Sequence, residues 1–321
     1  MGVAQVGSRL FDTPATMRRL RECVAEAREA GVEFLVFPEA FLGGYPKGLD
    51  FGARVGSRTP GGRDDFRRYF DSAITVPGPE TDELVELAAD AGMTLVVGVI
   101  ERDGGTLYCT AVYVTSGDGL VGTHRKLMPT ASERLIWGQG DGSTLEVFDS
   151  PTGRFSAAIC WENYMPQLRL ALYHDGVQLW CAPTVDDRDA WQTTMTHLAY
   201  EGRMFVLSAC QYLTRAAAPV DYNAVQGNDP ETVLIRGGSV IVSPLGEVLA
   251  GPLYGEEGIL VADIDLGEIA RGKYDLDVVG HYARPDIFDL RVDTTGADLT
   301  TIRDAVLALL DPTQGDLRDD T

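Results

Sequence analysis

The 321-residue sequence predicts an α/β protein in which helices cover the faces of β-sheets. Three observations support this fold class. Short apolar runs recur along the chain, segments with helical spacing of apolar residues lie between several of them, and Gly, Pro or Asp bounds the runs. No internal repeat, low-complexity tract or Gly/Ser/Pro-rich linker divides the chain, so we expect a single domain over residues 1–310.

Eight short runs of apolar residues are predicted to form the strands. Runs that are apolar without interruption are typical of strands buried in a sheet that is covered on both faces. In chain order, the predicted strands are residues 34–37, 95–100, 111–114, 155–159, 178–182, 204–210, 239–243 and 259–264.

Helical periodicity predicts the helices between these strands. Apolar residues recur at three- and four-residue spacing, with charged residues on the opposite face, and Gly31 and Gly92 end the first two helices. The last eleven residues, 311–321, carry four Asp and one Arg and are predicted to form a flexible acidic tail. The predicted helices are residues 16–30, 80–91, 191–203 and 299–310.

The charge balance excludes two classes of partner. Against 48 acidic residues the chain has 27 Lys and Arg, a formal net charge of −21, whereas nucleic acids and anionic membranes attract clustered cations. No apolar run approaches the roughly 18 residues of a membrane span, and residues 1–10 lack the pattern of a secretion signal. We therefore expect a cytoplasmic protein that binds neither nucleic acid nor membrane.

The cysteines are predicted to be free thiols. There are five, and they are too widely scattered for a disulfide framework or a closely spaced metal site. Most free cysteines are small buried hydrophobes, so we ask which one occupies an unusual place. The cysteines are Cys23, Cys109, Cys160, Cys181 and Cys210.

Glu39 is the first candidate for a functional residue. It follows a predicted strand and Pro38, and a loop with Gly43, Gly44 and Pro46 comes after it. The carboxyl ends of strands are where α/β sheets place their sites. Apolar and aromatic neighbours should raise the pKa of this carboxyl group, which suits a general base. A loop glutamate that caps neighbouring backbone is the alternative.

Lys126 and Cys160 are the second and third candidates. Lys126 ends three adjacent basic side chains, and it is either part of a solvated basic turn or a fixed positive charge beside a developing anion. Cys160 follows a strand and precedes a helix that Pro166 begins, with Asn163 as its expected N-cap. A thiol facing a helix N-terminus should have a depressed pKa and act as a nucleophile, although a core cysteine is the alternative.

Two other kinds of site are not indicated. The four histidines do not occur in the local signatures of Cys–His proteases, and no close cluster of His, Cys and Asp predicts zinc binding. The histidines are His124, His174, His197 and His281.

Taken together, the segments that carry these candidates resemble the carbon–nitrogen hydrolase (nitrilase) superfamily. They occur in that family's order, and the resemblance covers almost the whole chain. The tryptophan after the cysteine, Pro166, and residues 129–142 and 280–286 are similar to the nitrilase branch, whereas amidase and carbamoylase branches usually lack that tryptophan. The matching motifs are Phe37-Pro38-Glu39, His124-Arg125-Lys126-Leu127 and Cys160-Trp161-Glu162-Asn163.

This resemblance implies a four-layer αββα sandwich and a Glu-Lys-Cys triad. It implies Glu39 as general base, Lys126 as electrostatic stabiliser and Cys160 as nucleophile. It also points to Glu133 as a fourth catalytic residue, although this carboxylate could equally pair with a neighbouring arginine. Glu162 is interpreted as structural.

The implied activity is hydrolysis of a small nitrile to a carboxylic acid and ammonia through a thioimidate and a thioester on the cysteine. Neither a metal nor an organic cofactor is implied. The family forms homodimers that often build into larger or spiral homo-oligomers. An amidase, a carbamoylase, a cyanide-hydrating relative and a catalytically silent scaffold remain alternatives.

Aromatic residues near the motifs are predicted to line the substrate site, although each could equally pack in the core. They leave aliphatic, arylaliphatic and aromatic nitriles open, with the first two slightly favoured by similarity to plant-type members. These residues are Tyr45, Trp137, Trp161, Tyr164 and Trp191.

Overall fold

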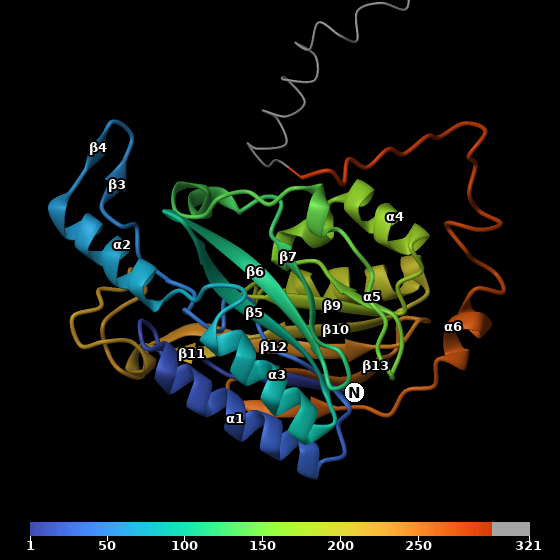
Figure 1. Ribbon diagram of the computed structural model, residues 1–321, viewed down its shortest axis with the longest axis horizontal. Helices are drawn as coiled ribbons and strands as arrows, with labels where there is room; N and C mark the ends of the chain where they lie inside the picture. Colours follow the sequence, from blue (N-terminus) through green and yellow to red (C-terminus); the bar gives the residue numbers. More distant parts are fainter. Residues whose placement is uncertain (297–321) are drawn as a thin grey trace, which may run out of the picture.

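The computed structural model describes residues 1–296, which form two large β-sheets with helices on their outer faces (Figure 1). Strands of the first sheet lie in the order β14, β1, β2, β5, β6, β7. The β1–β2 and β2–β5 pairs are parallel, and the other pairs are antiparallel. The strands are β1 (Gly2–Gln5), β2 (Phe34–Val36), β5 (Thr94–Asp103), β6 (Thr106–Thr115), β7 (Gly119–Arg125) and β14 (Gly258–Val261).

The second sheet has the order β11, β12, β10, β9, β8, and β13 pairs with β12. Its strands β10, β9 and β8, of which β8 is the edge strand, run parallel to one another. Parallel strands place their carboxyl ends at one edge of a sheet, which matters for the site described below. The strands are β8 (Phe155–Ala157), β9 (Leu179–Thr184), β10 (Phe205–Cys210), β11 (Tyr212–Thr214), β12 (Val233–Val242) and β13 (Val248–Tyr254).

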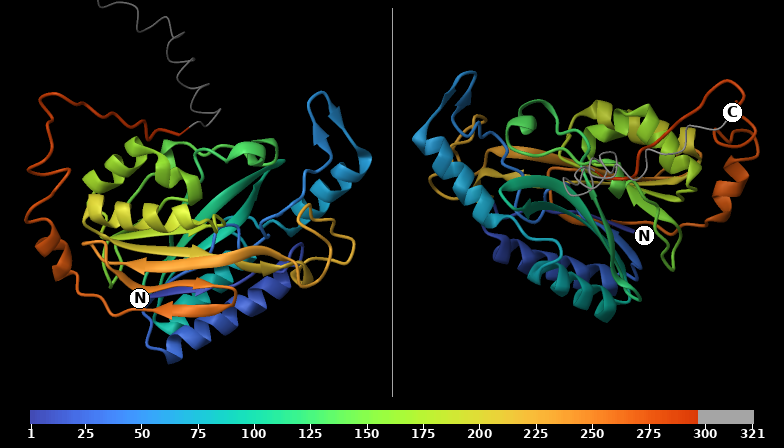
Figure 2. Two further views of the ribbon diagram at one scale, coloured as in Figure 1. Left: turned by 180° about the vertical axis from the view of Figure 1, so that it is seen from behind. Right: turned by 45° about the horizontal axis from the view of Figure 1, so that its top comes forward.

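Two helices cover each sheet, which produces the four layers α, β, β, α (Figures 1 and 2). Leu20 of α1 and Leu84 of α3 pack in one apolar cluster with the outer face of the first sheet. Leu168 of α4 and Met195 of α5 pack in another with the second sheet. The predicted fold class is therefore confirmed. The covering helices are α1 (Thr13–Glu29), α3 (Pro79–Ala91), α4 (Pro166–His174) and α5 (Asp189–Gly202).

A third apolar cluster fills the space between the two sheets. Phe34 of β2 and Phe155 of β8 meet there edge to face, with ring centroids 5.2 Å apart. Tyr113 of β6 packs against the same Phe155 ring, with centroids 5.5 Å apart. Because large aromatic side chains contribute strongly to core packing, these contacts hold the sheets face to face.

Local signals explain where the predicted helices begin and end. The Asp12 side chain accepts a hydrogen bond from the backbone N–H of Ala15 and caps α1. Glu80 and Asp82 lie in the first turn of α3, where carboxylates interact favourably with the helix dipole, and Gly92 ends this helix in the left-handed conformation.

The sequence prediction missed or misplaced several elements. His124 and Arg125 lie in β7, which the sequence did not predict, so the alternative of a solvated basic turn there is excluded. That strand is mostly half-buried and is not a continuously apolar run, so the apolar pattern does not predict it. The prediction missed β1 and β13 for lack of such runs, and it also missed α2, although Phe66, Tyr69 and Phe70 stand there at helical spacing. Other elements are α2 (Pro60–Ser72), α6 (Gly267–Gly272), β3 (Ala53–Arg54), β4 (Ser57–Arg58), η1 (Ala131–Leu135), η2 (Gly142–Thr144), η3 (Cys160–Tyr164) and η4 (Arg215–Ala217), the last four being 3-10 helices.

The predicted helix at residues 299–310, the domain boundary at residue 310 and the acidic tail at 311–321 lie outside the described residues. Over residues 1–296, we find no helix with both the length and the apolar character needed to cross a membrane.

Candidate active site

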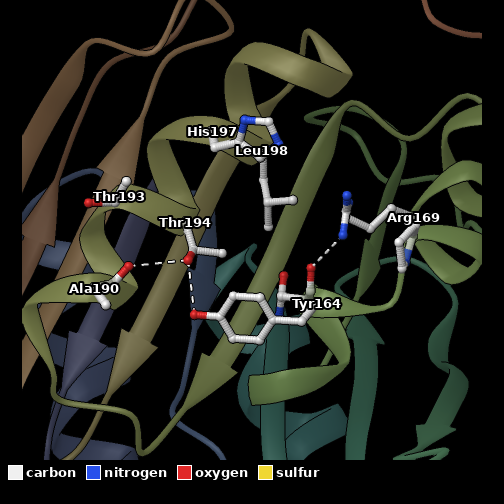
Figure 3. Close-up of a pocket in the computed structure, with 9 residues that line it drawn as sticks. Tyr164, Arg169, Ala190, Thr193, Thr194, His197 and Leu198 are labelled. Carbon is white, nitrogen blue, oxygen red and sulfur yellow. Dashed lines mark hydrogen bonds between the residues drawn. The ribbon is translucent and has the colours of Figure 1, made fainter.

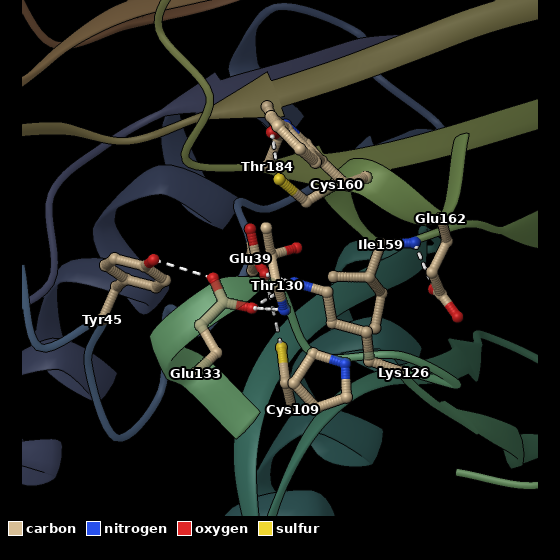
Figure 4. Close-up of polar contacts among 12 residues, drawn as sticks. Glu39, Tyr45, Cys109, Lys126, Thr130, Glu133, Ile159, Cys160, Glu162 and Thr184 are labelled. Atoms are coloured by element: carbon tan, nitrogen blue, oxygen red, sulfur yellow. Dashed lines mark hydrogen bonds and ion pairs between the residues drawn. The ribbon is translucent and has the colours of Figure 1, made fainter. Parts of the chain in front are cut away.

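Glu39, Lys126 and Cys160 lie together between the sheets, although 87 positions separate Glu39 from Lys126 (Figure 4). Glu39 follows β2 and Cys160 follows β8, so both lie beyond the carboxyl ends of strands that pair in parallel with a neighbour. Lys126 comes directly after β7, and its backbone N–H donates to the carbonyl of Cys109 at 2.8 Å. The fold thus brings together the three residues that the sequence singled out.

The backbone around Glu39 is tightly held. Gly98 of β5 lies against it, and a Cβ at this glycine would come within 2.1 Å of the Pro38 carbonyl oxygen. From the second sheet, the side-chain amide of Gln211 donates to the Glu39 carbonyl at 2.9 Å. Ala40 adopts a φ of 51°, a conformation that non-glycine residues rarely take. These contacts place the fully buried Glu39 carboxylate in one position.

Lys126 joins two carboxylates. Its Nζ donates to Glu39 Oε1 at 2.7 Å and to Glu133 Oε2 at 2.9 Å. Glu133 is held in turn by the backbone N–H of Thr130 at 2.6 Å and by the hydroxyl of Tyr45 at 2.8 Å. The cation that pairs with Glu133 is therefore Lys126, whereas Arg125, one of the arginines left open as its partner, pairs with Glu101 and Asp103.

Burial and neighbouring charges shift the pKa values of Lys126 and Glu39 in opposite directions. Burial alone would lower the pKa of the Lys126 ammonium, but Glu39 and other acidic groups nearby raise it well above its ordinary value. Burial raises the pKa of the Glu39 carboxyl group, and Lys126 only partly offsets that rise. The predicted direction for Glu39 is confirmed. Within the described chain, Glu39 Oε2 has no hydrogen-bond partner, which leaves this oxygen able to accept a proton.

Cys160 begins the 3-10 helix η3 and has a φ of 53°. This left-handed conformation is strained for a cysteine and must be held by its surroundings. Asn163 holds it, because its side-chain amide donates to the carbonyls of Ala158 and Cys160 at 2.8 Å each. The prediction that Asn163 caps α4 was wrong, since Met165 occupies that position, whereas Pro166 does begin the helix.

The prediction of a depressed thiol pKa at Cys160 was also wrong. Burial raises the pKa of this thiol, and the Glu39 carboxylate raises it further, while Lys126 acts in the opposite direction. Cys160 is 3% exposed. The physical reason is that desolvation of a thiolate outweighs a single nearby ammonium that already serves two carboxylates. The resting Cys160 side chain is therefore a neutral thiol.

Glu162 connects the Lys126 and Cys160 segments. Its carboxylate accepts the backbone N–H of Leu127 and of Ile159, each at 2.7 Å, and it pairs with His124 Nε2 at 3.1 Å. Leu127 follows Lys126 and Ile159 precedes Cys160, so one buried carboxylate sets the spacing between the two segments. These contacts agree with the interpretation of Glu162 as structural.

The His124–Glu162 pair predicts a pH-dependent contribution to stability. Burial would lower the pKa of His124, but Glu162 raises it; burial would raise the pKa of Glu162, but His124 lowers it. A histidine whose pKa is raised by folding contributes its full stabilisation of the fold at pH values below its unfolded pKa of about 6.5. This stabilisation is lost as the pH rises through the pKa of the folded state. Glu162, with a lowered pKa, loses its contribution as pH falls below about 4.3.

We therefore expect His124→Gln to reduce the free energy of unfolding by about 3 kcal/mol near pH 6, and by less at pH 9. Urea unfolding at several pH values measures this difference. His174→Gln, at a histidine whose side chain is 80% exposed, is the matched control. An equal loss of stability at pH 6 and pH 9 would contradict the assignment.

The five predicted substrate-lining aromatic residues separate into three groups. Tyr45 and Trp137 adjoin the group formed by Glu39, Lys126 and Glu133, which we call the acidic cluster. The Tyr45 hydroxyl donates to Glu133, and the Lys126 Nζ lies 5.6 Å from the Trp137 ring centroid. Trp161 and Tyr164 are about two-fifths exposed and stack edge to face. Trp191 is fully buried, and its indole donates to Ser208. Trp191 packs in the apolar cluster beneath α5, which is the alternative that the sequence left open for it.

A surface pocket of about 510 Å³ lies between α4 and α5 (Figure 3). Tyr164, Arg169 and His197 line it, and the Tyr164 hydroxyl bonds to Thr194 at 2.9 Å. None of the Glu-Lys-Cys residues borders this pocket. Tyr164 therefore faces a surface that is separate from the acidic cluster.

Sequence reasoning did not identify two residues that touch the triad. The Thr184 hydroxyl donates to Cys160 Sγ at 3.2 Å, and the Cys109 thiol lies 3.7 Å from Glu39 Oε1. Thr184 ends β9, a position at the carboxyl edge of a parallel strand that could have signalled it. Cys109 lies within β6, where nothing in the sequence distinguishes it from the buried Cys23, Cys181 and Cys210.

Comparison with known proteins identifies the family. The sequence pattern of the carbon–nitrogen hydrolase family matches residues 1–274. The chain belongs to this family. It is 57% identical over 282 residues to an aliphatic nitrilase from Sinorhizobium fredii, covering 88% of this chain and 91% of the relative. It is 52% identical over 294 residues to a bifunctional nitrilase/nitrile hydratase from Nicotiana tabacum, covering 90% and 84%.

These identities place the chain in the nitrilase branch of the carbon–nitrogen hydrolases, which are enzymes that cleave carbon–nitrogen bonds. A solved structure, the NitFhit protein of C. elegans, has the same fold, with a TM-score of 0.71 at 19% identity over 93% of this chain and 68% of that one. The predicted family membership is confirmed.

Proposed function

We propose that this carbon–nitrogen hydrolase converts an organic nitrile to its carboxylic acid and ammonia. The observation that carries this proposal is the buried contact of Lys126 Nζ with Glu39, beside the Cys160 thiol and the free Glu39 Oε2. A nucleophile, a proton acceptor and a fixed cation in a desolvated space are the parts that addition to a weakly electrophilic carbon requires. The nitrilase names of the relatives supply the substrate class.

The first step is attack by the thiol on the nitrile carbon. Because the resting thiol is neutral, Glu39 takes its proton as the C–S bond forms. The nitrile nitrogen gains negative charge, which the Lys126 ammonium stabilises and neutralises by donating a proton. The product is a thioimidate on Cys160, and Glu39 can return its proton to Lys126 across their hydrogen bond.

Water then adds to the thioimidate carbon, with Glu39 accepting a proton from it. The tetrahedral nitrogen is protonated and leaves as ammonia, so a thioester remains on Cys160. A second water, activated in the same way, releases the carboxylic acid and restores the thiol. General base catalysis of this kind accelerates a step by about 10²–10⁴-fold. Glu133 fixes the Lys126 ammonium by its second ion pair.

Release of an amide is a second outcome of the same intermediate. If the tetrahedral species expels the Cys160 thiol before the amine, the product is an amide. The bifunctional name of the Nicotiana tabacum relative favours measuring both products.

Ammonia and amide release from matched nitriles and amides tests the proposal. We expect ammonia from at least one of propionitrile, phenylacetonitrile and benzonitrile, and little from the corresponding amides. Release from the amides but not from the nitriles would replace the proposal with an amidase. Silence on both panels would favour a binding scaffold.

We further propose that the chain works in the cytoplasm and assembles as homodimers that build into larger homo-oligomers, as the resemblance implies. Light scattering of the purified full chain measures the assembly, and a monomer at micromolar concentration would contradict it.

A further inference from the structure

The end of β9 and the loop that follows it contact the segment around Cys160 through two residues, Thr184 and Asp186. Thr184 Oγ1 lies 3.2 Å from Cys160 Sγ, and the Asp186 carboxylate accepts the indole N–H of Trp161 at 2.9 Å. Thr184 is fully buried and Asp186 nearly so. Arg188 in turn bonds to Asp186 and lies over the Trp161 ring, 5.0 Å from its centroid. These contacts, together with those of Glu162 to Ile159, hold the strained turn at Cys160.

The hydrogen bonds of Thr184 determine where its hydroxyl proton points. The backbone N–H of Asp186 donates to Thr184 Oγ1 at 2.9 Å, so this oxygen already acts as an acceptor. Its own proton is then free for another acceptor, and Cys160 Sγ lies within reach (Figure 4). A thiolate accepts hydrogen bonds more strongly than a neutral thiol, because donors interact best with charged acceptors.

We propose that Thr184 is a further catalytic residue, whose hydroxyl donates to the Cys160 sulfur and stabilises the negative charge that develops on it as Glu39 takes its proton and it attacks the substrate. This inference rests on the proposed function of Cys160 as nucleophile. The need for such a donor follows from the site: burial and Glu39 both oppose the thiolate, and Lys126 is shared between Glu39 and Glu133. Proton transfer goes from Cys160 to Glu39, and Thr184 keeps its own proton throughout.

Two variants remove the donor and one retains it. Thr184→Val replaces the hydroxyl by a methyl group and keeps the side-chain shape. Thr184→Ala also removes the hydroxyl and adds no methyl group that could crowd the sulfur. Thr184→Ser retains the hydroxyl. Thr94→Val is the matched control, because Thr94 is equally buried in β5 but its hydroxyl has no hydrogen-bond partner in the described structure. Circular dichroism confirms that each variant folds.

Iodoacetamide alkylates the thiolate form of a cysteine. The rate at which it alkylates Cys160 between pH 6 and pH 9, followed by mass spectrometry, therefore reports on the thiolate and requires no nitrile substrate. We expect Thr184→Val and Thr184→Ala to slow alkylation at pH 7.5 about tenfold, because the fraction of thiolate falls when the donor is lost. Thr184→Ser and Thr94→Val should stay within about twofold of the native rate. Ammonia release from phenylacetonitrile should fall about tenfold in kcat for the Val and Ala variants, with KM little changed.

Unchanged alkylation and unchanged kcat in both hydroxyl-free variants would overturn the proposal. An equal loss in the Ser variant would also overturn it, because the hydroxyl would then not be the group that matters. A native chain that is alkylated at Cys160 but hydrolyses no nitrile would instead refute the proposed function, and the alkylation comparison would still decide the role of Thr184. If iodoacetamide does not reach Cys160, the kcat comparison decides it.

Discussion

Cys160→Ala is expected to abolish nitrile hydrolysis, with kcat falling by at least about 10⁴-fold; loss of the nucleophile costs a serine protease about 10⁶-fold. The thioimidate cannot form without the sulfur, and a neutral alanine leaves no group that can attack the nitrile carbon. The variant should fold, because it replaces a small buried side chain by a smaller one. Ammonia release measures turnover, and thermal unfolding measures stability.

Cysteines elsewhere in the fold provide the controls. Cys23 in α1 and Cys181 in β9 are buried and do not contact the acidic cluster. We expect Cys23→Ala and Cys181→Ala to lose stability by about 1 kcal/mol with kcat almost unchanged. Cys109 is a poor control, because its thiol contacts Glu39. Substantial turnover in Cys160→Ala would refute this residue as the nucleophile.

Lys126→Met is expected to have the second largest effect, and to change both activity and stability. Its ammonium lies 2.7 Å from Glu39 and 2.9 Å from Glu133, and its side chain is fully buried. Removing it leaves two carboxylates without a counter-charge, which costs about 3–5 kcal/mol in the free energy of unfolding. Losing the donor to the developing charge lowers kcat about 10²–10³-fold, corresponding to about 2.7–4 kcal/mol.

The loss of stability in Lys126→Met should depend on pH. Burial already raises the pKa of Glu39, and without the ammonium this pKa rises further. A carboxyl group whose folded pKa exceeds its unfolded value of about 4.3 stabilises the fold relatively at low pH and destabilises it as pH rises through the folded value. The loss in free energy of unfolding of Lys126→Met relative to the native chain should therefore be smaller at pH 5 than at pH 8, as measured by urea unfolding.

A double variant separates the two effects of Lys126. Glu39→Gln in the Lys126→Met background removes one uncompensated carboxylate, so part of the lost stability should return at pH 8 while turnover stays absent. If the double variant were less stable than Lys126→Met, the two side chains would not be coupled through charge in the way we describe. Recovery of turnover would contradict the role of Glu39 as general base.

Sequence reasoning could locate residues whose surroundings are local in the chain. Glu39, Lys126 and Cys160 each lie at the end of a strand and beside a proline-containing loop, so their positions could be read from neighbouring residues. It missed β7, where the polar residues hide a strand and the basic residue His124 lies fully buried against the Glu162 carboxylate.

The sequence by itself determined the alternation of helices and strands, the acidic composition and the residue types available for chemistry. Only the tertiary structure decided the direction of the Cys160 thiol pKa, the partner of Glu133 and the contact of Thr184 with the sulfur. The physical reason is that desolvation and hydrogen bonding depend on which segments pack together. Segments remote in the chain meet only when the two sheets close on one another, so no local pattern records those contacts.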